Sequence, residues 1–373
     1  MIGAEAVWKN EELAVFRLRS LYRRRGYTPF KMSKFEEYDL YARNKQFLVS
    51  ESVITFTDTN GKLMALKPDV TLSIIKNNKD VPGTVQKLYY DENVYRVSKG
   101  TRTFKELTQV GLECMGEIDE YCIAEVLALA ADSLAEISPE YVLDVSDLEL
   151  IGAVLADMGL SEQGASAMLH LIGEKNMHGI TKAASEAGVA KEKLDRLVAL
   201  LSADGDPALA IPALRALLPE CDEEIDRLAR VIATLEKHTR GGRVRLDFSV
   251  VNDMSYYNGI VFKGFVRHVP AGVLSGGQYD RLMEKMGRRA RAIGFAVYLD
   301  LLDRLGEGAP AFDVDTVLLY EDDADLATLC ALSDEMIAGG KSVSVCRDVP
   351  EHIKYKQLLR MKNGEVTLLE AHA

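Results

Sequence analysis

The spacing of hydrophobic positions changes several times along the chain, and each change predicts a different kind of element. Between residues 11 and 25, apolar side chains recur every three or four positions, which is typical of an amphipathic helix. From residue 27 to residue 145, β-rich runs are separated by turn signals such as DTNG at residues 58–61. This part of the chain predicts strands at 53–57, 63–66, 84–90, 107–116 and 141–145, and a helix at 121–136.

A change in composition separates residues 147–238 from the β-rich segments on either side. This stretch is rich in Ala, Leu, Glu and Lys at helical spacing, and a strand pattern resumes at 243–250 and 256–266. We therefore expect one core formed by residues 1–146 and 239–306, whose sheet is interrupted by an all-helical insertion.

The C-terminal part, residues 311–373, follows the linker-like sequence GEGAP at residues 306–310. Its strand and helix patterns alternate, which is typical of a small α/β domain. The elements predicted for it are strand 316–320, helix 325–338, strand 342–346, helix 351–361 and strand 365–369.

The composition is that of an ordinary globular protein, because 47% of the 373 residues are hydrophobic and 27% are charged. A chain of this length is expected to form two or three domains. The net charge of −12 argues against a large nucleic-acid surface, since binding to phosphate backbones needs clustered Lys and Arg.

Cysteine and histidine positions predict neither disulfides nor a metal site. The 5 cysteines are scattered without a Cys-x-x-Cys pair, and the 6 histidines show no metal-ligand spacing. The sequence has no phosphate-binding loop and no dinucleotide fingerprint, so we expect no cofactor. Because neither a signal-peptide pattern nor an apolar run of membrane-spanning length occurs, we expect a cytoplasmic protein with no membrane contact.

The most informative motif lies near the end of the core, where residues 294–302 read GFAVYLDLL. This segment resembles the last signature of class II aminoacyl-tRNA synthetases, which reads GFAxGLERL in the histidyl enzymes. The resemblance implies an arginine that binds the triphosphate of ATP through a planar fork of donors. Here Leu301 stands at the arginine position, and Tyr298 replaces a glycine that leaves room for the nucleotide.

A second synthetase signature is found at residues 88–96 (LYYDENVYR) and 105–113 (KELTQVGLE). By resemblance, Arg96 keeps an arginine that contacts the α-phosphate of ATP, whereas Lys105 replaces a second arginine and loses its bidentate geometry. Gln109 and Glu113 lie four apart in a predicted strand and therefore share a face. In histidyl-tRNA synthetases the matching pair receives an α-ammonium group; the alternative is two polar residues on a half-solvated strand face.

The segment LKPDVT at residues 66–71 resembles another part of the synthetases' amino-acid site. The resemblance implies that Asp69 and Thr71 line this site. A Pro-Asp turn that caps the following helix accounts for the same residues without a ligand, and the two interpretations are compatible.

The segment VNDMSYYNGIVF at residues 251–262 resembles the histidine-specific signature of the same enzymes. It keeps Tyr256 and Tyr257, and Tyr279 follows the glycine pair further along the chain, so the resemblance implies an aromatic pocket wall. Asn252 stands where the synthetases have an arginine that acts at the adenylation step. Tyrosines on a strand are also common packing residues.

These resemblances imply an α+β fold: a class II synthetase-like antiparallel sheet flanked by helices, with an all-helical insertion. The C-terminal α/β domain resembles a reduced form of the synthetases' anticodon-binding domain. Residues 26–36 match the outline of the first class II signature, which forms the dimer interface in that family, so a homodimer is expected.

An amino-acid pocket beside an altered ATP site resembles the regulatory subunits of short-form ATP phosphoribosyltransferase, the first enzyme of histidine biosynthesis. The string KELTQVG is closer to that family's REFTQAG than to RQFHQ of the synthetases. The resemblance implies a non-catalytic subunit that assembles with the short-form catalytic subunit in a hetero-oligomer, activates it and mediates feedback control by histidine. Two alternatives stay open: a divergent histidine–tRNA ligase, and a stand-alone histidine-binding or tRNA-binding paralogue.

Overall fold

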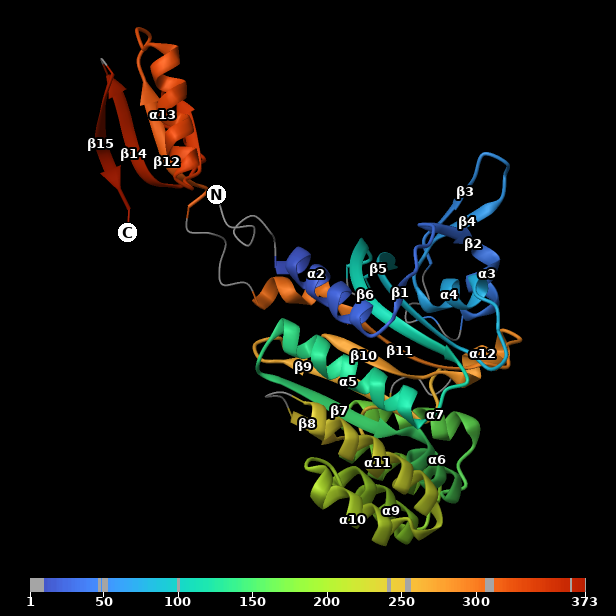
Figure 1. The fold of residues 1–373 in the computed structure, drawn as a ribbon. Coiled ribbons are helices and arrows are strands. Elements are labelled where there is room, and N and C mark those ends of the chain that lie inside the picture. Colours follow the sequence, from blue (N-terminus) through green and yellow to red (C-terminus); the bar gives the residue numbers. More distant parts are fainter. Residues whose placement is uncertain are drawn as a thin grey trace. The chain divides into compact units, whose positions relative to one another are not determined.

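The computed structural model describes residues 10–45, 48, 53–98, 101–239, 243–251, 256–305, 312–362 and 364–372. The chain divides into two compact units, shown in Figure 1. Residues 14–305 form the larger one, which we call the core unit, and residues 306–373 belong to the smaller one, the C-terminal unit. The expected linker at 306–310 lies outside the described residues.

The core unit is built on an eight-stranded sheet with the strand order β1-β5-β6-β11-β10-β9-β7-β8. Neighbouring strands are antiparallel, except for the parallel pairs β1/β5 and β7/β8 at the two ends. This sheet, flanked by helices, confirms the expected α+β fold class. Its strands are β1 (Thr28–Pro29), β5 (Val85–Val97), β6 (Phe104–Gly116), β7 (Tyr141–Asp147), β8 (Arg243–Leu246), β9 (Ile260–Val266), β10 (Leu274–Gln278) and β11 (Arg291–Tyr298).

Two long amphipathic helices, α2 (Asn10–Arg24) and α5 (Glu120–Ile137), bury their apolar sides in the main core of this unit. The buried residues of α2 are Ala14, Leu18 and Tyr22, at the spacing of four that the sequence predicted. The hydroxyl groups of Tyr22 and Ser133 share a hydrogen bond of 3.0 Å, which links the two helices. Helix α2 is therefore anchored by one side, and its other side faces solvent.

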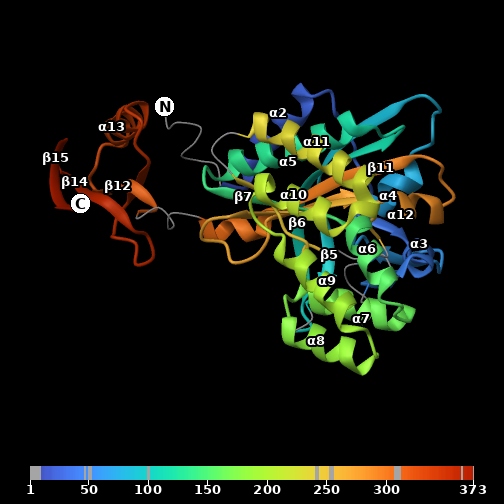
Figure 2. The ribbon, with the colours of Figure 1, turned by 90° about the horizontal axis from the view of Figure 1, so that it is seen from below.

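Six α-helices and the short 3-10 helix η2 (Pro219–Cys221) follow β7 and precede β8 in the sequence, and Figure 2 shows the α-helices from below. Because β7 and β8 pair directly in the sheet, this helical segment is inserted within a single sheet. The helix with the longest buried stripe is the last, whose Ile225, Leu228, Ile232 and Leu235 are buried. The helices are α6 (Leu148–Asp157), α7 (Glu162–Gly173), α8 (Met177–Glu186), α9 (Lys191–Ser202), α10 (Pro207–Leu217) and α11 (Asp222–His238).

A small three-stranded sheet with the order β2-β4-β3 lies beside two short helices in the core unit. The predicted hairpin is confirmed, since β3 and β4 pair antiparallel and the amide of Asp58 donates to the carbonyl of Lys62 across the turn. These elements are β2 (Phe35–Glu37), α3 (Tyr38–Arg43), β3 (Thr55–Thr57), β4 (Leu63–Leu66) and α4 (Thr71–Asn77). Helix α12 (Asp280–Lys285) and the 3-10 helix η3 (Leu299–Leu305) complete the core unit.

The C-terminal unit holds a four-stranded sheet with the order β13-β12-β14-β15 and one helix. The helix predicted at 351–361 is wrong, because this segment forms strand β14 between β12 and β15. Leu358 and Leu359 point to opposite faces of the sheet and both are buried there, a pattern that a central strand shares with a weak helix. The elements are β12 (Val314–Tyr320), α13 (Leu326–Ala338), β13 (Val343–Cys346), β14 (Tyr355–Lys362) and β15 (Glu365–Ala371).

Two predicted strands of the core are shorter than their sequence patterns suggested. The strand expected at 243–250 ends at Leu246, and the strand expected at 256–266 begins at Ile260. Within the described part of the chain, no helix is long and apolar enough to cross a membrane.

The core packing of α5 gives a direct stability test. Leu127 is completely buried in the main core, so Leu127→Ala removes apolar contacts and leaves a cavity. We expect the free energy of unfolding to fall by about 2–5 kcal/mol, measured by urea denaturation. The exposed residue Glu136 on the same helix provides the matched control, and Glu136→Ala should change stability by less than about 0.5 kcal/mol. Equal effects of the two substitutions would contradict the packing of α5.

Candidate functional site

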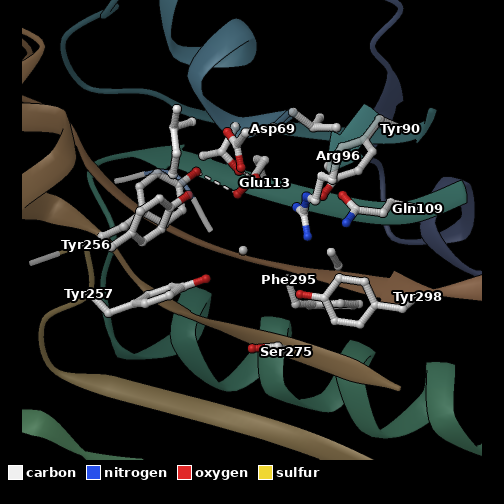
Figure 3. A pocket seen from close by; sticks show the side chains of 16 residues that line it. Asp69, Tyr90, Arg96, Gln109, Glu113, Tyr256, Tyr257, Ser275, Phe295 and Tyr298 are labelled. Carbon is white, nitrogen blue, oxygen red and sulfur yellow. Dashed lines mark hydrogen bonds between the residues drawn. The ribbon is translucent and has the colours of Figure 1, made fainter. Parts of the chain in front are cut away.

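A cavity of about 400 Å³ lies in the core unit over strands β6 and β11 (Figure 3). This volume lies in the range of small-molecule sites, roughly 300–1,000 Å³. The cavity is lined by Leu48, Asp69, Val70, Thr71, Tyr90, Arg96, Gln109, Glu113, Tyr256, Tyr257, Ser275, Tyr279, Gly294, Phe295, Ala296 and Tyr298.

All seven residues expected in the amino-acid pocket line this cavity, and so do two of the five expected around ATP. The seven are Asp69, Thr71, Gln109, Glu113, Tyr256, Tyr257 and Tyr279, and the two are Arg96 and Tyr298. Lys105 is exposed on β6, and Leu301 packs against the main core, so neither lines the cavity. The expected position Asn252 lies outside the described residues.

Glu113 is a buried carboxylate in the middle of the sheet, with 2% of its surface exposed. One of its oxygens accepts a hydrogen bond of 2.7 Å from the hydroxyl of Thr71, and the other accepts one of 2.6 Å from the hydroxyl of Tyr279. Burial raises the pKa of Glu113 to about 8, and the two hydroxyl donors oppose this shift only in part. Burial at this position therefore favours the neutral form of Glu113 at pH 7.

Gly294 provides the space that the Glu113 side chain occupies. The two residues are cross-strand partners on β11 and β6, and a Cβ atom at position 294 would lie 1.8 Å from a Glu113 carboxylate oxygen. No conformational change of a few tenths of an ångström relieves such an overlap. Position 294 therefore requires glycine as long as Glu113 keeps this orientation.

Three tyrosines form an aromatic wall of the cavity near Glu113: Tyr256 and Tyr257, which Figure 3 labels, and Tyr279, which donates a hydrogen bond to Glu113. The ring centroids of Tyr256 and Tyr257 are 4.4 Å apart, and those of Tyr256 and Tyr279 are 5.8 Å apart. These distances lie in the range of favourable tilted aromatic pairs, so the rings hold one another in place. A flat ligand group can stack on such a wall.

Asp69 and Arg96 bring opposite charges to the cavity. An oxygen of Asp69 accepts a hydrogen bond of 2.9 Å from the amide of Leu72, so this carboxylate also caps the first turn of α4. Burial raises the pKa of Asp69, although its backbone donors and the guanidinium of Arg96 lower it in part. Arg96 is held by a 3.1 Å hydrogen bond from its Nε to the carbonyl of Pro68, and its guanidinium points into the cavity (Figure 3).

Tyr298 lies opposite Gln109 in the register of β11 and β6, and both side chains line the cavity. The phenol ring therefore occupies space on the sheet where a glycine would leave an open surface. Burial raises the pKa of Tyr298, and the nearby guanidinium of Arg96 lowers it in part.

Sequence reasoning missed Tyr90, Ser275 and Phe295 as cavity residues. Tyr90 was detectable, because it lies six residues before Arg96 on β5 and therefore on the same face of the strand. Ser275 carries no comparable signal, since only the pairing of β10 with β11 brings it beside Tyr298 and Ala296.

The arrangement suits a small zwitterion with a flat ring better than it suits a metal. The lining offers two carboxyl groups for a cationic group, one guanidinium for an anionic group, and tyrosine rings for a flat ring. Among the described residues, no group of three His, Cys, Asp or Glu side chains could hold a metal ion.

Comparison with known proteins places the chain in a family. The sequence model of the histidyl-tRNA synthetase family matches residues 4–302. A protein of Acetivibrio thermocellus named ATP phosphoribosyltransferase regulatory subunit is 27% identical over 318 residues, which cover 82% of this chain and 76% of the relative.

Two solved structures share the fold. One is described as an ATP phosphoribosyltransferase regulatory subunit/histidyl-tRNA synthetase from Bacillus halodurans, with 24% identity, a TM-score of 0.75 and 96% coverage of both chains. The other belongs to the ATP phosphoribosyl transferase (HisG:HisZ) complex of Thermotoga maritima, with 18% identity, a TM-score of 0.62 and coverage of 76% of this chain and 96% of that chain. The chain thus belongs to the histidyl-tRNA synthetase family, and within it resembles the ATP phosphoribosyltransferase regulatory subunits, as expected from its motifs.

Proposed function

We propose that this chain is the regulatory subunit of ATP phosphoribosyltransferase, a non-catalytic protein of the cytoplasm, and that its cavity binds histidine. The names of its relatives support this role, as does the fold it shares with a chain of the HisG:HisZ complex. The observation that carries the proposal is the cavity itself, in which all seven residues expected for the amino-acid pocket lie near Tyr298, the residue that replaces a glycine of the synthetases.

The three groups of histidine have complementary partners in the cavity. The α-ammonium group lies between Gln109 and Glu113, where it compensates the buried carboxylate. The carboxylate faces Arg96, and the imidazole ring stacks on Tyr256 and Tyr257.

The ATP side lacks the donors that adenylation needs. Leu301 is apolar and packs against the core. Lys105 carries its charge on a single ammonium group, whereas the synthetases have the planar guanidinium of an arginine at this position. Loss of one donor to a transition state typically costs about 10²–10³ in rate, so two such losses would cost roughly 10⁴ or more if they add. Tyr298 further reduces the space for a nucleotide on the sheet. A chain of this kind is a poor synthetase.

Regulation then follows as a coupling between two sites. The hetero-oligomer is built on a homodimer of this chain and has more than one arrangement of its subunits. Histidine bound in the cavity favours one arrangement, and the active site of the short-form catalytic subunit also favours one. A coupling of this kind typically changes affinity about 5–150-fold.

Mixing the chain with the short-form catalytic subunit of the same organism tests this function. We expect the two proteins to co-elute from a sizing column, and the rate of phosphoribosyl transfer to ATP to rise at least about fivefold. Histidine should then lower the rate. The Glu113→Gln variant should still activate but should respond to histidine only weakly. If the unchanged chain neither co-elutes nor changes the rate, the proposed function is wrong.

Calorimetry with histidine tests the pocket through its proton linkage. Glu113 is protonated at pH 7, and an ammonium ligand favours the charged carboxylate, so binding at pH 7 should release about one proton. The affinity should rise with pH below the raised pKa of Glu113, by at most about tenfold per pH unit, and the rise should weaken as the pH approaches about 8. Titrations are carried out in phosphate and in Tris buffer, and the difference between the two binding enthalpies measures the number of protons that the buffer takes up.

Two variants on β6 separate this effect from a general change of the strand. Glu113→Gln should weaken binding and abolish proton release, whereas Glu106→Gln, at an exposed carboxylate of the same strand, should change neither. No heat from the unchanged chain would remove the histidine assignment. Binding without proton release would remove Glu113 as the partner of the ammonium group.

The family match favours a second candidate function, that of a divergent histidine–tRNA ligase. The two candidates differ in histidine-dependent exchange of pyrophosphate into ATP. We expect no exchange above background, because the replaced residues cannot stabilise the transition state. Exchange at a rate sufficient for translation would establish the ligase instead.

A further inference from the structure

The sheet beneath the cavity has large polar side chains at both ends and small residues in the middle. The cross-strand pairs of β6 and β11 are, in order, Glu113 with Gly294, Gly111 with Ala296, and Gln109 with Tyr298. At about 3.3 Å per residue, the four positions from Glu113 to Gln109 span roughly 13 Å along the strand. The cavity therefore has a second polar end, well separated from Glu113.

Arg96, Gln109 and Tyr298 line this second end, here called the Tyr298 end (Figure 3). Gln109 is 4% exposed, yet its side-chain amide forms no hydrogen bond with any other described residue. Arg96 donates from its Nε to the carbonyl of Pro68, and its two terminal nitrogens bond to none of the described residues. Buried polar groups are usually hydrogen-bonded, so donors left free toward a cavity indicate a ligand.

The hydroxyl of Tyr298 points into the cavity and carries a proton that it can donate (Figure 3). The backbone amide of Tyr298 donates a 2.8 Å hydrogen bond to the carbonyl of Val273, which fixes this end of β11. Burial raises the pKa of Tyr298, and the guanidinium of Arg96 and a hydrogen bond with Ser275 lower it only in part. The phenol is therefore neutral at pH 7 and can act as a hydrogen-bond donor to an anion.

The ring of Tyr298 limits how far a ligand can extend over the sheet. Gly294, Ala296 and Tyr298 share one face of β11 because of the two-residue repeat, and all three line the cavity. The first two leave the surface of the sheet open, whereas the third places a phenol ring on it. A ligand whose ammonium group lies near Glu113 therefore meets this ring with its other end.

We propose that the Tyr298 end binds a free, ionised carboxylate, and that Tyr298 makes the cavity selective for the free amino acid over its esters and its alcohol. This inference rests on the proposed function and names the chemical class of ligand that the cavity accepts. The guanidinium of Arg96 and the hydroxyl of Tyr298 both donate to the carboxylate, and hydrogen bonds to an ionised acceptor are the strong ones. An ester has no charge to offer these donors, and its extra group meets the ring.

Three ligands with the same imidazole ring and the same amine test the proposal. Histidine has the carboxylate, histidinol has a CH2OH group in its place, and histidine methyl ester has a neutral, longer group. Each is titrated calorimetrically at pH 7 into the unchanged chain and into the variants Tyr298→Phe and Tyr298→Ala. The first variant removes only the hydroxyl, and the second also removes the ring.

We expect the unchanged chain to bind histidine at least about tenfold more tightly than histidinol, because the alcohol leaves the guanidinium of Arg96 unpaired. Tyr298→Phe should weaken histidine binding about threefold to tenfold and leave histidinol binding unchanged. Tyr298→Ala should bind the methyl ester at least about tenfold more tightly than the unchanged chain does. Such a gain cannot result from a folding defect.

Tyr95→Phe is the matched control, since Tyr95 lies on β5 outside the cavity lining and its hydroxyl donates to Glu106. It removes one hydrogen-bonded hydroxyl from the same sheet and should change none of the three affinities. Equal binding of histidine and histidinol by the unchanged chain would overturn the carboxylate site. Equal weakening of both ligands in Tyr298→Phe, or no gain of ester binding in Tyr298→Ala, would overturn Tyr298 as the selective residue.

The same titrations separate this inference from the proposed function. If the unchanged chain does not bind histidine at all, the histidine assignment and the carboxylate site fall together. If it binds histidine, histidinol and the methyl ester equally well, the histidine pocket stands and only the selectivity is wrong.

Discussion

The buried carboxylate of Glu113 is the constraint on which the site depends. A carboxylate inside a protein is costly unless hydrogen bonds or an opposite charge compensate it. Here the donors are Thr71, at the start of α4, and Tyr279, directly after β10. These two residues are 42 and 166 positions away from Glu113 in the chain, so three distant segments meet at one carboxyl group.

The sheet determines where that carboxyl group lies. Strand β6 pairs with both β5 and β11, and this pairing places Gln109 and Glu113 in the middle of the sheet, opposite Tyr298 and Gly294. Only glycine at position 294 leaves room for the Glu113 carboxylate. The compensation by two hydroxyl groups is incomplete, as the raised pKa of Glu113 demonstrates. Under the proposed function, a ligand with a cationic group would complete it, so that an otherwise unfavourable residue serves binding.

Under the proposed function, the chain keeps ligand binding while adenylation is lost, because the two activities depend on different residues. The proposed ligand binding uses the carboxylate, the amide and the aromatic wall of the cavity. Adenylation needs, in addition, cationic donors that stabilise charge in a transition state. Replacement of those donors leaves the packing of the sheet intact, since Leu301 simply joins the core.

Most of the expected cavity residues came from the resemblance of short segments to synthetase signatures, whereas spacing alone predicted only which side chains share a strand face. Gln109 and Glu113 share a strand face because of the two-residue repeat, and the same repeat relates Tyr90 to Arg96, although Tyr90 was overlooked. Asp69 was expected to cap a helix or to line a pocket, and it does both. The strand β14 could not be told from a weak helix, because consecutive leucines fit either when the neighbours are unknown.

The sequence by itself determined the position of the helical segment between two strands through local periodicity, which neighbours in the chain already specify. Its resemblance to synthetase signatures implied the α+β class and the kinds of side chain available to a pocket. Only the tertiary structure decided which side chains meet. The direction of Leu301 into the core, the need for glycine at position 294 and the raised pKa of Glu113 all depend on contacts between segments far apart in the sequence. Pairing and burial create those contacts, and no local pattern encodes them.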